Sequence, residues 1–154
     1  MRKTFLIHHI SGFKGWETCF HFAMDKSDTF QIIFQVDGDA SDEDGLNAGK
    51  QKFLGMSSIT VSPYEGMQKS IKATGELNTA ARELFQTYVE PSFEGWKQNL
   101  WSFQFLKGKN AMLRVEDFSV ALLFLDESEV ADLLALGISV DGTDFQEIDN
   151  FPVE

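Results

Sequence analysis

Residues 29–36 read Thr-Phe-Gln-Ile-Ile-Phe-Gln-Val, with a large apolar side chain at every second position. A strand sends alternate side chains to opposite faces, so this run predicts a strand that buries one face in the core. Residues 16–24 alternate in a similar way, because four large apolar residues share one parity: Trp16, Phe20, Phe22 and Met24. The polar residues 25–28 separate the two runs. We therefore expect a β-hairpin over residues 16–36.

Further strands are expected outside this hairpin, at residues 4–10, 57–63, 111–115 and 118–125. The last of these runs is almost wholly apolar, which is typical of a central strand. The segment 64–77 contains two glycines and no continuous apolar stripe, so it is expected to be a loop that could hold a short helix.

Helices are expected at residues 46–54, 78–89, 92–103 and 126–136. Asn78 and Asp126 can cap the second and the fourth, because their side chains accept hydrogen bonds from free N–H groups. Pro91 stops the second helix, and Gly137 ends the fourth. The third helix is expected because an apolar stripe with helical spacing runs through Phe93, Trp96, Leu100 and Phe103.

Together these elements predict a single α+β domain over residues 1–154. It would have an antiparallel sheet of about five or six strands, with roughly two or three helices packed on one face. A chain of 154 residues can bury one core without disulfides but is too short for two ordinary domains. The tail 138–154 is acidic yet keeps apolar residues, so we expect it to dock on the body as an edge strand.

The charge of the chain is strongly negative and unevenly distributed. The sequence has 13 Lys and Arg against 24 Asp and Glu, a formal net charge of −11. All 13 cations lie in residues 1–114, whereas residues 115–154 hold 11 carboxylates and no Lys or Arg. Direct binding to nucleic acid or to an anionic membrane is not expected, because both need cations on the protein. A basic protein partner would be attracted, and acidity that only maintains solubility is the alternative.

We predict that carboxylates of an exposed loop and of the tail bind this partner, with two tryptophans as apolar anchors. The loop residues are Asp37, Asp39, Asp42, Glu43 and Asp44, the tail residues are Asp141, Asp144, Glu147 and Asp149, and the anchors are Trp96 and Trp101. In its most specific form the prediction is an immunity-type or inhibitory protein that occludes the active site of a basic toxin or nuclease. The alternatives are a structural component of a phage or secretion system and a small enzyme or ligand-binding domain.

No motif in the sequence indicates catalysis, a metal or a cofactor. The P-loop, dinucleotide-binding, nucleophile-elbow and zinc-protease patterns are all absent. Cys19 and His21 would share a strand face with Glu17, but their spacing is not diagnostic of a catalytic triad or a zinc site. We expect a half-buried strand face there. The acidic loop also fails as an EF-hand, because Asp42 and Ala48 stand where Gly and Glu are needed.

Cysteine usage and the N-terminus indicate a cytoplasmic protein. The single Cys19 cannot form an internal disulfide. His8 and His9 interrupt the first apolar stretch too early for a signal peptide. No apolar run approaches the roughly 18 residues needed to cross a bilayer, so no membrane span is expected.

Overall fold

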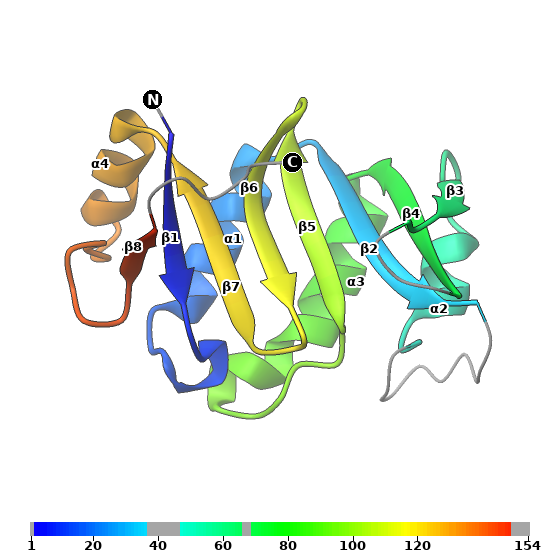
Figure 1. Cartoon of the computed structure of the whole chain (residues 1–154), viewed down its shortest axis with the longest axis horizontal. Coiled ribbons are helices and arrows are strands. Elements are labelled where there is room, and N and C mark those ends of the chain that lie inside the picture. Colours follow the sequence, from blue (N-terminus) through cyan, green and yellow to red (C-terminus); the bar gives the residue numbers. More distant parts are fainter. Residues whose placement is uncertain (1, 37–46, 66–68, 149–154) are drawn as a thin grey trace.

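The computed structural model describes residues 2–36, 47–65 and 69–148. These residues form one antiparallel sheet of eight strands in the order β3-β4-β2-β5-β6-β7-β1-β8 (Figure 1). The strands are β1 (Lys3–Ile7), β2 (Thr29–Gln35), β3 (Thr60–Pro63), β4 (Ser70–Glu76), β5 (Ser102–Lys107), β6 (Asn110–Glu116), β7 (Val120–Leu125) and β8 (Gln146–Ile148). The α+β class and the antiparallel sheet are confirmed, but the expected count of five or six strands is wrong.

The described chain also contains four α-helices and two short 3₁₀ turns. The helices are α1 (Trp16–Lys26), α2 (Lys50–Leu54), α3 (Thr79–Val89) and α4 (Glu127–Ala135), and the turns are η1 (Ile10–Gly12) and η2 (Glu90–Glu94). None of these helices is long and apolar enough to cross a membrane.

The expected hairpin over residues 16–36 is wrong in its first half, because Trp16–Lys26 is the helix α1. Trp16, Cys19, Phe20 and Ala23 are all fully buried, and they are spaced as one face of a helix. Phe22 and Met24 are also buried, which is why the same residues produced an apparent alternation. The second half is confirmed, since β2 alternates between buried and half-buried residues along its whole length.

Two segments expected to be loop or helix are strands. The segment 64–77 contains β4, in which Gly75 pairs with Phe30 of β2. A Cβ at Gly75 would lie 2.8 Å from the Phe30 ring, so this glycine permits a close approach within the sheet. The expected helix at 92–103 is wrong, because η2 ends at Gly95 in a left-handed conformation with φ 91° and β5 begins at Ser102.

The two capped helices are confirmed. The Asn78 side chain accepts a hydrogen bond from Ala81 N at the start of α3. At α4, Asp126 accepts from Glu129 N while the Glu129 carboxylate accepts from Asp126 N, which completes a capping box. Gly137 follows α4 with φ 93°. The expected edge strand of the tail is present as β8, which pairs with β1.

The main core lies between the sheet and the helices α1 and α3, which share one side of the sheet (Figure 1). Phe20 of α1 and Phe85 of α3 both contact Phe105 of β5, with ring centroids 5.6 Å and 4.8 Å apart. Phe105 and Phe103 therefore point toward the helices. Because side chains alternate along a strand, Ser102 and Gln104 lie on the other side of the sheet, which we call the distal face.

Candidate functional site

Three of the predicted acidic residues lie at one end of the sheet, where α4 and β8 lie beside β1 (Figure 1). Asp141, Asp144 and Glu147 lie between α4 and the end of β8, and all three are exposed. The other predicted acidic residues, Asp37, Asp39, Asp42, Glu43, Asp44 and Asp149, lie outside the described residues.

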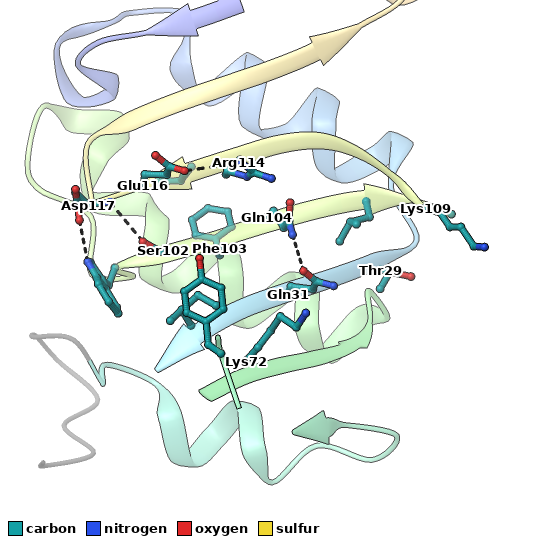
Figure 2. A pocket seen from close by; sticks show the side chains of 16 residues that line it. Thr29, Gln31, Lys72, Ser102, Phe103, Gln104, Lys109, Arg114, Glu116 and Asp117 are labelled. Atoms are coloured by element: carbon teal, nitrogen blue, oxygen red, sulfur yellow. Dashed lines mark hydrogen bonds and ion pairs between the residues drawn. The ribbon is translucent and has the colours of Figure 1, made fainter. Parts of the chain in front are cut away.

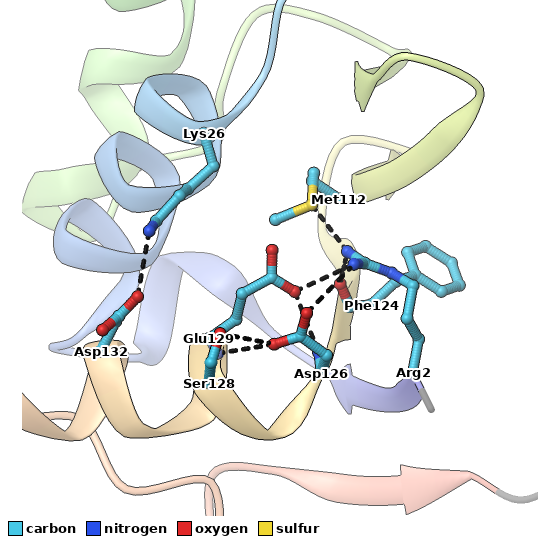
Figure 3. Close-up of polar contacts among 8 residues, drawn as sticks. All are labelled: Arg2, Lys26, Met112, Phe124, Asp126, Ser128, Glu129 and Asp132. Carbon is cyan, nitrogen blue, oxygen red and sulfur yellow. Dashed lines mark hydrogen bonds and ion pairs between the residues drawn. The ribbon is translucent and has the colours of Figure 1, made fainter.

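Several carboxylates at this end are already paired with cations of the body (Figure 3). An Arg2 nitrogen lies 3.0 Å from Glu129 Oε1, and Lys26 Nζ lies 3.0 Å from Asp132 Oδ2. Lys3 Nζ lies 3.8 Å from Glu147 Oε1. These pairs neutralise part of the charge that the sequence assigned to partner binding. In the described part of the chain, Glu127, Asp141 and Asp144 have no such ion pair.

The pKa of Asp126 is held below its ordinary value. The main cause is the hydrogen bond that its carboxylate accepts from Glu129 N, and Ser128 and Arg2 act in the same direction against a smaller opposing effect of desolvation. This carboxylate is therefore ionised as the cap of α4, and its negative charge stabilises the N-terminus of that helix.

A groove of about 600 Å³ runs between α1 and α4. Carboxylates lie on both walls, with Glu17 and Asp25 on α1 and Asp132 on α4. Leu136, just after α4, is 56% exposed and also lines the groove. Lys26 and His21 line the groove too, and Lys26 pairs with Asp132. The groove thus holds three carboxylates against one lysine, with an apolar contact at its margin.

A second depression of about 570 Å³ lies on the distal face (Figure 2), and we call it the distal hollow. Its floor is formed by strands β4, β2, β5 and β6. Strand register places Gln31 of β2 opposite Gln104 of β5, and Gln104 opposite Arg114 of β6. Gln104 Nε2 donates a hydrogen bond to Gln31 Oε1, whereas the buried Gln104 Oε1 has no hydrogen-bond partner in the described structure.

The rim of the distal hollow contains one of the predicted anchors, Trp101. Its indole N–H donates to Asp117 Oδ1 at 3.1 Å, and its carbonyl accepts from Phe118 N at 2.9 Å. Asp117 and Phe118 form the tight β6–β7 turn. Their φ angles of 49° and 69° are left-handed, a backbone conformation that residues other than glycine seldom adopt. The contacts of Trp101 hold this strained turn in place.

The other predicted anchor, Trp96, lies in neither depression. It follows η2, its backbone N donates to Pro91 O, and 70% of the residue is exposed. The structure therefore does not bring the two tryptophans together with the acidic residues of the tail.

Cys19 and His21 do not share a face. Both lie on α1, where a separation of two residues turns side chains to nearly opposite sides of the helix. Cys19 is fully buried, whereas the His21 side chain is 37% exposed, with Nε2 3.9 Å from Glu17 Oε2. No group of three or more potential metal ligands occurs among the residues that the structure describes.

Burial raises the pKa of the Cys19 thiol to about 12. We expect Ellman's reagent at about pH 8 to leave Cys19 unmodified in the native protein, because a buried neutral thiol is a poor nucleophile. After unfolding in guanidinium chloride, the same reagent should label one thiol per chain. Labelling of the native protein at the unfolded rate would contradict the burial of this side chain.

Comparison with known proteins gives no relative, since no family model, curated protein or solved structure matches the chain. The candidate sites therefore depend on their geometry alone.

Proposed function

We propose that this chain is a binding module for a basic protein, which it engages through the groove between α1 and α4. The observation that carries the proposal is the set of carboxylates in one groove, with Glu17 and Asp25 on α1 and Asp132 on α4. Lys26 already pairs with Asp132 at 3.0 Å and Arg82 lies 3.9 Å from Asp25, so a basic partner would compete with these cations. Glu127 of α4, and Asp141 and Asp144 between α4 and β8, are exposed and add charge beyond the groove. Opposite charges on two surfaces accelerate their encounter and fix their relative orientation.

Apolar contacts would supply the centre of this interface. Leu134 and Leu136 are 59% and 56% exposed, and Leu136 lines the groove. Protein interfaces combine an apolar centre with a charged rim, and an exposed leucine beside carboxylates fits that pattern. In the most specific form of the proposal, the partner is a toxin or nuclease whose substrate-binding Lys and Arg residues are covered by these carboxylates, as in immunity-type inhibition.

The experiment is affinity capture from a native lysate with three forms of the chain. Glu17→Gln combined with Asp25→Asn removes two charges from the groove, and Glu65→Gln combined with Glu76→Gln removes two exposed charges elsewhere. Each exposed ion pair contributes up to about 1 kcal/mol, so the groove variant should bind the captured partner roughly 3- to 30-fold more weakly than the control variant.

Salt provides the second measurement. Raising the ionic strength from about 0.1 M to 1 M shortens the screening length from roughly 10 Å to 3 Å, so affinity for the partner should fall steeply. A captured partner that is acidic, or that binds both variants equally and ignores salt, would contradict the proposal.

A further inference from the structure

The distal hollow differs in charge from the rest of this acidic protein. Three cations line it, Lys72, Lys109 and Arg114, against two carboxylates, Glu116 and Asp117. Both carboxylates have partners in the described structure, since Asp117 accepts a hydrogen bond from the Trp101 indole and Glu116 lies 4.0 Å from Arg114, and the cations still exceed them by one. In a chain with a net charge of −11, the hollow is thus a local site of positive charge.

Arg114 is the central cation, and in the described structure it makes a long ion pair but no hydrogen bond. Its side chain is 17% exposed, and its closest carboxylate oxygen, on Glu116, lies 4.0 Å away. The guanidinium carbon also lies 5.9 Å from the Phe124 ring centroid. The described structure shows no hydrogen bond from its guanidinium, although this group has five N–H donors in a fork that matches a carboxylate or a phosphate.

Gln104 adds an unpaired acceptor next to Arg114. Its Oε1 is buried and has no partner, while its Nε2 is held by Gln31. A buried acceptor without a donor costs free energy, so a turn of the Gln104 amide that brings Oε1 to a hydrogen-bond donor of a bound molecule would remove that cost. Figure 2 shows Gln31, Gln104 and Arg114 on adjacent strands of the hollow floor, with Lys72 close by.

From these observations we propose that the distal hollow binds a small organic anion that carries both a carboxylate or phosphate group and a hydroxyl or N–H donor. The anionic group pairs with the Arg114 fork, and Lys72 adds attraction from the β4 side. The donor bonds to Gln104 Oε1 after the side-chain amide turns this oxygen into the hollow. A volume of about 570 Å³ lies within the range of about 300–1,000 Å³ typical of small-molecule sites.

This site is separate from the proposed protein interface, because the hollow and the α1–α4 groove share no lining residue. A ligand in the hollow therefore does not require a basic partner in the groove. Failure of one proposal leaves the other unaffected.

The test is a ¹H–¹⁵N NMR titration of the full chain at constant ionic strength. Citrate and glucose 6-phosphate each combine an anionic group with hydroxyl groups and distinguish a carboxylate from a phosphate ligand, while glucose is the neutral control. At least one anion should produce saturable shifts at the side-chain amides of Gln31 and Gln104 and at the Trp101 indole, and glucose should produce none. Absence of saturable shifts with both anions, or equal shifts with glucose, would overturn the proposal.

Variants locate the binding. Arg114→Gln should raise the dissociation constant about tenfold or more, as expected for loss of a charge-assisted hydrogen bond. Lys14→Gln removes the same charge from an exposed position outside the hollow and should leave affinity unchanged. Lys72→Gln is the second hollow variant and decides the result if Arg114→Gln does not fold. Unchanged affinity in the folded hollow variants would refute the site.

Discussion

Replacing Phe85 with Ala should lower the free energy of unfolding by about 3–5 kcal/mol, the range for removing a large aromatic side chain from a core. Phe85 is fully buried on α3. Its ring centroid lies 5.2 Å from Phe30, 5.0 Å from Phe53, 5.1 Å from Phe103 and 4.8 Å from Phe105. Because this one ring contacts α2, β2 and β5, its loss leaves a cavity that no single neighbour can fill. Urea unfolding monitored by circular dichroism measures the change.

The matched control for this prediction is Trp96→Ala, which also truncates a large aromatic side chain. Trp96 is 70% exposed, so its substitution should change the free energy of unfolding by no more than about 0.5 kcal/mol. If Phe85→Ala costs as little as the control, the aromatic cluster does not hold α3 on the sheet.

The features that the sequence predicted well depend on neighbouring residues. Asn78 and Asp126 cap helices through N–H groups three residues ahead, so short-range chemistry suffices to place both helix starts. The strand β2 was predicted because its alternation between faces runs unbroken.

The errors came from segments in which local patterns compete. In residues 16–24 the four apolar residues of one parity predicted a strand, but the fully buried set includes Cys19 and Ala23, two small residues counted with the polar face. A small residue on a helix face lets neighbouring elements approach, and only the packed structure shows that Cys19 lies inside. Gly75 led to the wrong prediction of a loop. Its role in the strand depends on the close approach of the Phe30 ring from another strand, which the local sequence does not show.

The distal hollow could not be derived from the sequence. Gln31 is far in the chain from Gln104 and Arg114, which lie on the neighbouring strands β5 and β6, and only the pairing of β2 with β5 brings the three together. The alternation in β2 did place Gln31 away from the core. What was missing was the strand β5, because residues 92–103 were expected to be helical and Gln104 was left without a register.

Replacing Arg2 with Met should lower the free energy of unfolding by about 3 kcal/mol, because the buried Glu129 carboxylate would lose its cation. The Glu129 side chain is 6% exposed and lies 3.0 Å from the guanidinium, which also donates to Phe124 O at 2.6 Å (Figure 3). The value is at the lower end of the range for broken buried pairs because a quarter of the Arg2 side chain is exposed. Guanidinium chloride unfolding gives the measurement.

A double variant separates the cost of an unpaired charge from the loss of packing around Arg2. Glu129→Gln removes the charge but keeps a side-chain oxygen that can accept the capping hydrogen bond from Asp126 N. If the unpaired carboxylate causes the loss, Arg2→Met combined with Glu129→Gln should recover about half of the stability lost in Arg2→Met alone, since replacing both partners of a buried pair costs less than removing one. If the two substitutions simply add, Arg2 stabilises this end of the sheet through its contacts with Phe124 and Met112, and the charge of Glu129 has no part in it.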